Sequence, residues 1–358
     1  MTLRSPAALL EAGLIEAAAL PALTRVAERY AVAITPAVAA LMEPNDAGDP
    51  LARQFVPTTA ELHTRPEERL DPIGDEVHSP VPGIVHRYPD RVLLKLLHVC
   101  PVYCRFCFRR EVVGPDGEGT LDAEAVDRAL AYVAAHAEIW EVILTGGDPL
   151  VLSPRRLGAV LERLGTMAHV KVVRLHSRVP AVAPERIGPA LVAALKRFPG
   201  AVFVALHANH PREFTPDARA ACGRLVDAGI PMLSQSVLLR GVNDDPATLE
   251  ALMRAFVETR IKPYYLHHGD LAPGTAQFRT TVTDGRALVG ELRGRVSGLC
   301  QPTYVLDIPG GHGKAVLAAS TAEPDGQGGW SVCDRHGRMH AYADVVDEDA
   351  APETGWPA

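Results

Sequence analysis

Apolar runs of strand length alternate with segments of helical spacing along most of this chain. Six strand–helix pairs in sequence predict an α/β fold with a parallel sheet and helices on its outside. The strand candidates are residues 92–97, 141–145, 170–175, 201–206, 232–238 and 262–267. The helical candidates are residues 121–133, a helix starting at Ser153-Pro154, and residues 184–198, 216–228, 246–259 and 283–296. Periodicity alone does not show whether the sheet closes into a barrel.

Three of the six cysteines lie in one loop directly after the first strand. Cys100, Cys104 and Cys107 follow the buried apolar run 92–97 with the spacing C-x3-C-x2-C. An iron–sulfur cluster of four irons normally takes four cysteines, so three thiolates leave one iron open to another ligand. The spacing therefore indicates a metal centre with one open position.

Three other interpretations of these cysteines compete with the iron–sulfur one. Free cysteines are often buried in a core, but clustering on a loop disfavours that. A disulfide would leave one thiol over and needs an oxidising compartment, of which the sequence has no sign. Zinc is the strongest rival, because His98 could complete a Cys3His site. Structural zinc ligands, however, usually come as two separated pairs.

The composition disfavours several other classes of function. The 358 residues carry a net charge of −7, which argues against general nucleic-acid binding. Glu11 and Glu16 interrupt the apolar stretch 7–23, so this stretch predicts an amphipathic helix and not a signal peptide. No run is long enough to span a bilayer. Clustered thiols without partners favour the reducing cytoplasm.

From about residue 80 to about residue 344 the sequence resembles the lysine 2,3-aminomutase family of radical S-adenosylmethionine (SAM) enzymes. The resemblance is carried by the cysteine spacing, by Cys107-Phe-Arg-Arg110 and by the stretches described below. It implies an incomplete (β/α)6 barrel over residues 86–300. Residues 1–85 would form an N-terminal helical extension. Residues 301–358 would form a small C-terminal extension with a β-hairpin of residues 330–333 and 339–342.

The resemblance also implies a 4Fe–4S cluster on Cys100, Cys104 and Cys107, whose open iron is chelated by SAM. A lone His or Gln residue is more often structural than functional. The stretch Gly-Gly-Asp-Pro, residues 146–149, is by itself only a tight turn. In parallel β/α folds, however, sites lie at the carboxyl ends of the strands, where these residues fall. The residues implied to contact SAM are Phe106, Gly146, Gly147, Asp148, His207 and Gln235.

A second cofactor, pyridoxal 5′-phosphate (PLP), is implied by two further stretches. Arg87, Tyr88 and Arg91 match the residues that hold its phosphate, and a phosphate dianion does suit guanidinium partners. Lys314 matches the lysine that forms the Schiff base with PLP. The loop before it is not a P-loop, because that motif would need Gly at Ile308 and a hydroxyl at Ala315.

The implied substrate residues are Arg109 for the carboxylate of lysine and Asp270 and Asp307 for its side-chain ammonium. Surface placement is the default for a single Asp, but both lie at strand ends. A buried carboxylate needs a cationic partner. Two acids and one arginine complement a zwitterion with an extra amine. A glutamate-selective relative would have little use for the acid pair.

The resemblance therefore implies an isomerase that interconverts L-lysine and β-lysine by migration of the amino group. The alternatives are an enzyme that makes β-lysine for elongation factor P, an aminomutase of ornithine, arginine or glutamate, and a zinc-binding scaffold protein. The implied partners are an electron donor such as flavodoxin or ferredoxin and, in a homo-oligomer, further copies of the chain. Clostridial relatives carry a C-terminal zinc cysteine cluster, which Cys222, Cys300 and Cys333 are too scattered to replace. The acidic last dozen residues are expected to be mobile.

Overall fold

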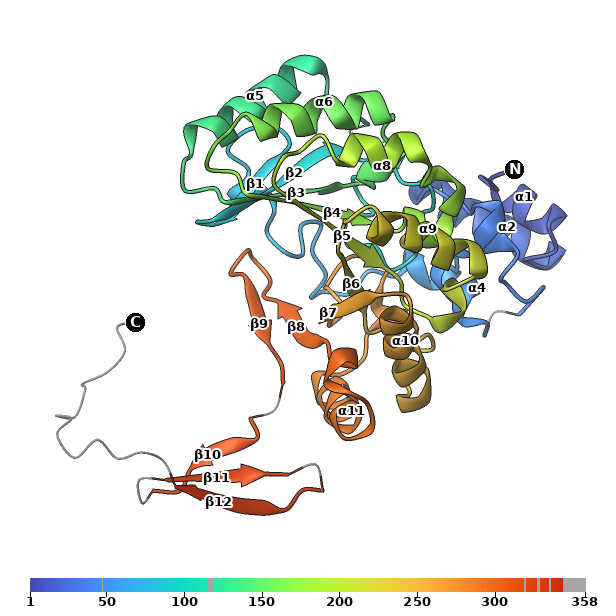
Figure 1. Ribbon diagram of the computed structural model, residues 1–358. Coiled ribbons are helices and arrows are strands. Elements are labelled where there is room, and N and C mark those ends of the chain that lie inside the picture. The colour runs from blue at the N-terminus through green and yellow to red at the C-terminus, as the bar shows by residue number, and fades with distance from the viewer. Residues whose placement is uncertain (47, 115–118, 319, 327–328, 335, 344–358) are drawn as a thin grey trace.

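The computed structural model describes residues 1–358 except 47, 115–118, 319, 327–328, 335 and 344–358. Its main feature, within these residues, is one curved sheet of nine strands that follow each other in chain order (Figure 1). The strands are β1 Ile84–Tyr88, β2 Arg91–Leu97, β3 Glu141–Gly146, β4 Val172–Ser177, β5 Ala201–His207, β6 Met232–Val237, β7 Ile261–His267, β8 Thr303–Asp307 and β9 Lys314–Val316. β2 to β8 are parallel, whereas β1 and β9 pair antiparallel at the two edges.

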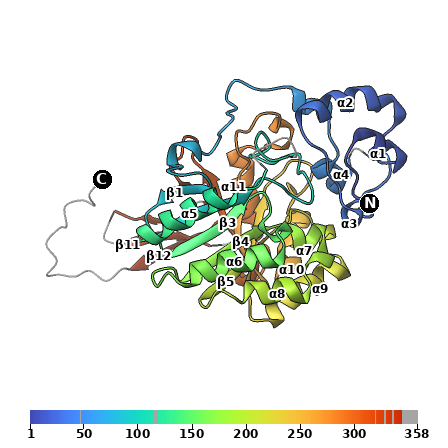
Figure 2. The same cartoon turned by 90° about the horizontal axis from the view of Figure 1, so that it is seen from above.

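The helices that connect the parallel strands cover the outer face of this sheet (Figure 2). They are α5 Ala123–Ala135, α6 Pro154–Gly165, α7 Val179–Val182, α8 Pro189–Leu195, α9 Pro216–Asp227, α10 Pro246–Glu258 and α11 Val282–Arg295. The six predicted strands are β2 to β7, and the incomplete (β/α)6 barrel is confirmed. The predicted helix 184–198 is a 3-10 turn followed by α8, because Gly188-Pro189 interrupts it.

The alternation of side chains along each strand separates the core from the interior of the half barrel. On β2, Val92, Leu94 and Leu96 are buried in the hydrophobic core. Leu93 lines the interior, and Lys95 pairs with the carboxylate of Asp75. The helices begin where the sequence provides a cap, since Ser153 accepts a hydrogen bond from the backbone N–H of Arg156. Strand period and caps thus place the loops after the strands around one interior.

Residues 1–85 form short helices that pack against the barrel (Figure 1). These are α1 Pro6–Glu11, α2 Leu20–Arg29, α3 Pro36–Ala39 and α4 Pro50–Phe55. The single amphipathic helix predicted for residues 7–23 is wrong. Gly13 has a left-handed φ of 69° and ends α1, with the N–H of Leu14 donating to the carbonyl of Leu9 at 2.9 Å. None of the described helices is both long and apolar enough to cross a membrane.

The C-terminal strands β10 Ala322–Pro324, β11 Gly329–Cys333 and β12 Met339–Ala343 form a separate antiparallel sheet beside the barrel (Figure 1). Trp330 lies opposite Tyr342, which confirms the predicted hairpin. The barrel sheet continues through residue 300, because β8 pairs with β7 and β9 with β8. The division into 1–85, 86–300 and 301–358 stays a prediction. The last dozen residues, expected to be mobile, lie outside the described part of the chain.

Candidate active site

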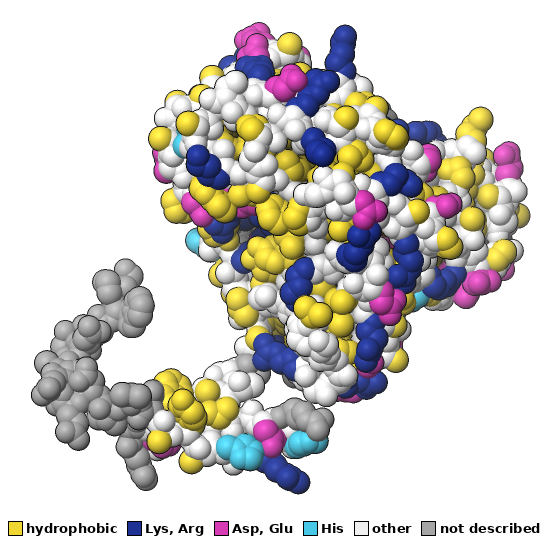
Figure 3. Space-filling view, in the orientation of Figure 1, with side chains coloured by type: hydrophobic (Ala, Val, Ile, Leu, Met, Phe, Trp, Pro, Cys, Tyr) yellow, Lys and Arg dark blue, Asp and Glu magenta, His cyan; other side chains and the backbone are white. Residues whose placement is uncertain are grey.

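A cavity of about 670 Å³ runs through the interior of the half barrel. Val85 on β1 and Val316 on β9 line it at the two edges of the sheet, and Figure 3 shows hydrophobic side chains gathered between these edges. Every site residue named from the sequence lines this cavity: Arg87, Tyr88, Arg91, Cys100, Cys104, Phe106, Cys107, Arg109, Gly146, Gly147, Asp148, His207, Gln235, Asp270, Asp307 and Lys314. Their separate roles stay predictions.

The cavity extends along the strands, and not only across their carboxyl ends. The cysteine loop and His207 lie at the carboxyl ends, as expected. Arg91 and Glu141, however, are the first residues of β2 and β3 and line the opposite end. There Glu141 accepts hydrogen bonds at 2.9 and 3.2 Å from Arg174. A half barrel without a packed interior therefore has room for ligands along its whole depth.

The three cysteines fit a cationic metal cluster. Cys100, Cys104 and Cys107 are free thiols. Burial, and then the neighbouring acidic groups, raise the pKa of Cys100 well above its ordinary value, and burial raises that of Cys107 to about 11. These thiolates therefore need positive charge beside them, which iron provides. The guanidinium of Arg178 donates to Cys104 Sγ at 2.9 Å and supplies part of it.

No three His, Cys, Asp or Glu side chains that could hold one metal ion are found among the described residues.

A buried ion-pair cluster braces the cysteine loop from outside the cavity. Arg105 and Arg110 flank the last two cysteines, and both pair with Glu61 of the N-terminal extension. Arg105 also donates to the carbonyl of Ala31 at 2.8 Å. Burial of two arginines requires such partners, because an unpaired buried charge is costly. Sequence reasoning missed Glu61, since nothing around it marks it as the partner.

Gly146, the last residue of β3, and Gly147 lie against the backbone that leads into the cysteine loop. A Cβ on Gly147 would lie 2.3 Å from the carbonyl oxygen of Val99, and one on Gly146 would lie 2.6 Å from that of Leu97. Gly146 also has a left-handed φ of 104°. The space beside the two glycines is taken by the loop that carries Cys100. A contact of these glycines with SAM stays a prediction.

Asp148 joins the ends of β3 and β4. Its buried carboxylate accepts hydrogen bonds from the backbone N–H of Leu150 at 3.0 Å and of Arg178 at 2.7 Å, and from Ser177 Oγ at 2.8 Å. Burial nevertheless raises its pKa, against these hydrogen bonds. The network holds Arg178, and therefore Cys104, in a fixed position.

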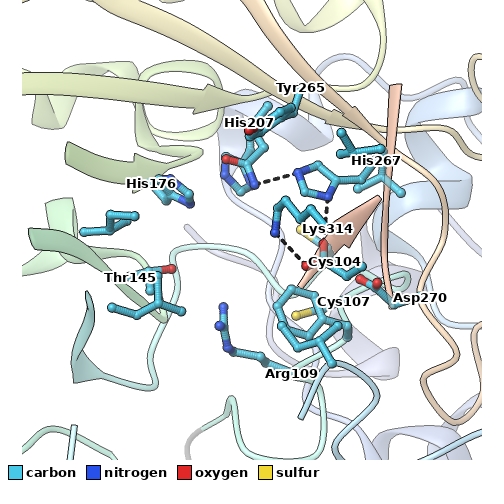
Figure 4. Close-up of a pocket in the computed structure, with 18 of the residues that line it drawn as sticks. Cys104, Cys107, Arg109, Thr145, His176, His207, Tyr265, His267, Asp270 and Lys314 are labelled. Carbon is cyan, nitrogen blue, oxygen red and sulfur yellow. Dashed lines mark hydrogen bonds and ion pairs between the residues drawn. The ribbon is translucent and has the colours of Figure 1, made fainter. Parts of the chain in front are cut away.

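Neutral imidazoles line the middle of the cavity (Figure 4). Burial lowers the pKa of His176 well below its ordinary value and that of His207 to about 3. The Nε2 atoms of both are buried without a hydrogen-bond partner, as is Oε1 of Gln235. Gln235 Nε2 lies 2.9 Å from Nε2 of His267. Unsatisfied buried groups in a cavity fit a polar ligand such as SAM.

The two acids differ in their partners. Asp307 Oδ1 accepts from the Lys314 ammonium at 2.6 Å, and Oδ2 lies 3.2 Å from Nδ1 of His267. Burial alone would raise the pKa of Asp307, but these two partners outweigh it and lower the pKa below its usual range. Asp270 is half-buried, and its Oδ1 is buried without a hydrogen-bond partner. Burial, and then Asp307, raise the pKa of Asp270 to about 7.

Arg87, Tyr88 and Arg91 lie beside Lys314. The hydroxyl of Tyr88 accepts a hydrogen bond from the backbone N–H of Lys314 at 2.9 Å, and the guanidinium of Arg91 stacks on the Tyr88 ring at 3.9 Å. Arg87 donates to the carbonyl of Ile73 at 2.7 Å, while its Nε is buried without a partner. An unused guanidinium donor close to a lysine fits the phosphate of PLP.

The loop before Lys314 requires most of its glycines. Gly310, Gly311 and Gly313 have left-handed φ values of 89°, 87° and 91°. His312, between Gly311 and Gly313, is exposed and has no left-handed φ. A side chain is therefore tolerated at this position.

Sequence reasoning also missed other residues of the cavity. His176 and His267 were visible only as polar residues at strand ends, and Arg178 only as a residue after β4. Asp75 had no local signal at all, yet it pairs with Arg87 and Arg109.

A parallel half barrel with three cysteines after its first parallel strand defines a radical SAM enzyme. The Radical SAM superfamily model matches residues 94–252. L-lysine 2,3-aminomutase of Clostridium subterminale is 43% identical over 283 residues, covering 79% of this chain and 68% of that protein. The enzyme of the same name from Fusobacterium nucleatum is 40% identical over 290 residues, covering 81% and 68%. Glutamate 2,3-aminomutase of Clostridioides difficile is 36% identical over 292 residues, covering 82% and 68%.

This chain belongs to the lysine 2,3-aminomutase family. It is therefore an isomerase of the radical SAM type, and its cofactors are a 4Fe–4S cluster, SAM and PLP.

Proposed function

We propose that this enzyme interconverts L-lysine and β-lysine. The observation that carries the proposal is the charge pattern of one cavity. Arg109 can bind a carboxylate there, and the acids Asp270 and Asp307 can bind an ammonium. Lysine has a carboxylate and a side-chain ammonium in addition to the amino group that migrates. Relatives named L-lysine 2,3-aminomutase, at up to 43% identity, support the same substrate.

The cavity residues have separate roles in this proposal. Cys100, Cys104 and Cys107 hold the cluster, and Phe106, Gly146, Gly147, Asp148, His207 and Gln235 position SAM. Arg87, Tyr88, Arg91 and Lys314 hold PLP. When bound, these groups supply a carbon radical and a ring that carries the amino group between neighbouring carbons.

The protein itself contributes binding, orientation and exclusion of water. Asp307 pairs with the Lys314 ammonium in the structure, and a substrate ammonium of the same charge can replace it there. Asp270 gains a counter-charge when the ammonium arrives, which offsets its burial. The imidazoles of His176 and His207, whose Nε2 atoms are buried, stay neutral and orient ligands by hydrogen bonds.

The test is incubation of the reduced enzyme with SAM, PLP and L-lysine, followed by chromatography for β-lysine. Ornithine, arginine and glutamate are compared at equal concentration. A faster reaction with glutamate would overturn the assignment of lysine as the substrate. Glutamate is the most informative rival, because a glutamate 2,3-aminomutase is 36% identical to this chain. The acid pair argues against it, because glutamate would bring a third carboxylate to Asp270 and Asp307. An enzyme that makes β-lysine for elongation factor P would act on the same free lysine, so that alternative is tested by following whether the product is attached to the factor.

Partners and compartment follow from the same chemistry. The open iron requires an external one-electron donor, such as flavodoxin or ferredoxin. Three thiols without disulfide partners support a reducing compartment, the cytoplasm. We propose a homo-oligomer as the assembly, to be tested by sedimentation.

A further inference from the structure

The segment before β1 contributes Ile73 to the lining of the cavity, although its sequence indicates no chemistry. We call residues 65–79 the strap. The backbone N–H of Arg69 donates to the carbonyl of Leu271 at 2.8 Å, and His78 Nε2 lies 3.0 Å from the carbonyl oxygen of Gly311. Gly74 approaches Gly311 so closely that a Cβ on Gly74 would lie 2.4 Å from its nitrogen. The strap is therefore fixed to the loop that carries Lys314.

Asp75 of the strap reaches the arginines expected to bind anions. Its Oδ1 accepts from Arg87 Nη2 at 3.2 Å, and its Oδ2 accepts from Arg109 at 3.2 Å (Nε) and 2.9 Å (Nη2). The ammonium of Lys95 lies 3.9 Å from Oδ2. Asp75 is only 7% exposed. Burial would raise its pKa, but Arg109, Lys95 and Arg87 outweigh it and lower the pKa, so Asp75 is ionised.

The geometry of this pair leaves Arg109 available. A guanidinium has five N–H donors and can bind one carboxylate along its Nε–Nη2 side and another across its two Nη atoms. Asp75 takes the Nε–Nη2 side of Arg109. In the described part of the chain, the recorded hydrogen bonds of Arg109 do not use Nη1, and Arg109 lines the cavity (Figure 4). The end of the guanidinium is therefore presented to a ligand.

We propose that Asp75 is a positioning residue of this active site, holding Arg109 side-on so that its free end receives the carboxylate of the substrate. The inference rests on the proposed function, because Arg109 is the carboxylate ligand only there. Asp75 also links Arg109 to Arg87, the predicted phosphate ligand. Without it, Arg87, Arg109 and Lys95 would face one another without their shared anion, and Arg109 would lose its fixed plane.

The test measures binding without turnover. Enzyme loaded with PLP but lacking SAM and reductant is titrated with L-lysine, and separately with cadaverine, which is lysine without its carboxylate. The visible absorption of bound PLP reports both. Asp75→Asn removes the charge and keeps the shape. Glu76→Gln is the matched control, because Glu76 is the next residue of the strap and is exposed.

We expect Asp75→Asn to weaken lysine binding about 10- to 100-fold, as for loss of a charge-assisted hydrogen bond, and cadaverine binding less than threefold. Asp75→Glu should restore part of the lysine affinity, and Glu76→Gln should match the wild type. In an Arg109→Gln background, Asp75→Asn should have little further effect.

Two results would overturn the inference. Equal losses for lysine and cadaverine would show a merely structural role, and tighter lysine binding in Asp75→Asn would show that Asp75 competes with the substrate. Failure of the proposed function looks different, because the wild type itself would then prefer ornithine, arginine or glutamate. In that case the preferred amino acid and its decarboxylated amine replace lysine and cadaverine. A wild type that binds none of the four would remove both proposals.

Discussion

Two groups of residues in the cavity are built in opposite ways. The cysteine loop comes from eight consecutive positions, 100–107, and its chemistry is visible in the spacing alone. The charged group, Arg87, Arg109, Asp270, Asp307 and Lys314, comes from segments far apart in the chain. In the first group the residue types decide the chemistry. In the second group each residue's state depends on which neighbours the fold supplies, as the two aspartates show by the opposite directions of their pKa shifts.

The largest effect is expected at the cysteine loop. Cys104→Ser should remove the cluster and lower activity about a thousandfold or more, because serine does not replace a thiolate on iron. Iron analysis and visible absorption after anaerobic reconstitution measure this. Cys333→Ser is the control, since Cys333 lies in β11, away from the cavity. A full complement of iron in Cys104→Ser would contradict the assignment.

A loss of similar size is expected in the charged group for Lys314→Ala. The variant should retain no PLP after borohydride reduction, and activity should fall about a thousandfold or more. Mass spectrometry of peptides from reduced enzyme measures the adduct. Lys196→Ala, at an exposed position on the outer face, should behave as the wild type. An adduct that persists in Lys314→Ala would place the reactive lysine elsewhere.

Replacing Asp270 or Asp307 by asparagine should change the stability of the apoenzyme in opposite directions. Because the pKa of Asp270 is raised to about 7, the unfolded chain loses this proton first, and Asp270 destabilises the fold as pH rises from about 4 to about 7. Asp270→Asn should therefore stabilise the apoenzyme at pH 8 by about 1–3 kcal/mol. Asp307→Asn should destabilise it, because the pKa of Asp307 is lowered by partners that the amide loses. Thermal and urea unfolding measure both.

The same difference predicts how substrate binding depends on pH. Below pH 7, Asp270 is protonated and no longer attracts an ammonium, so the dissociation constant for lysine should rise up to about tenfold per pH unit. Asp270→Asn should bind weakly and without this dependence. A wild-type profile that is flat between pH 5.5 and 8 would show that Asp270 is already ionised in the free enzyme.

The smallest effect is expected in the loop before Lys314. His312→Gly should change stability by less than about 0.5 kcal/mol and leave PLP affinity within twofold, because His312 is exposed and its backbone needs no glycine. Gly313→Ala is the contrasting variant, since its left-handed φ of 91° strains any side chain. PLP titrations of the two variants should therefore differ. Equal affinities would mean that the loop is less constrained than its backbone indicates.

Much of the fold could be predicted because its causes are local. The apolar run of β2, the cap at Ser153 and the turn between β11 and β12 each act within a few residues. The prediction failed where a local pattern was overridden by another local one, as when Gly13 divided the expected N-terminal helix. The site residues were placed by resemblance, and their meeting in one cavity agrees with it.

By itself the sequence determined the order of strands and helices, the cysteine spacing and the backbone freedom before Lys314, since each of these depends on neighbours in the chain. Only the tertiary structure decided that Glu61 braces the cysteine loop and that Asp75 pairs with Arg109. It also decided that the pKa of Asp270 is raised while that of Asp307 is lowered. The physical reason is that charge interactions and desolvation act through space. A carboxylate's pKa and its partners are set by atoms within a few ångströms, whatever their distance along the chain.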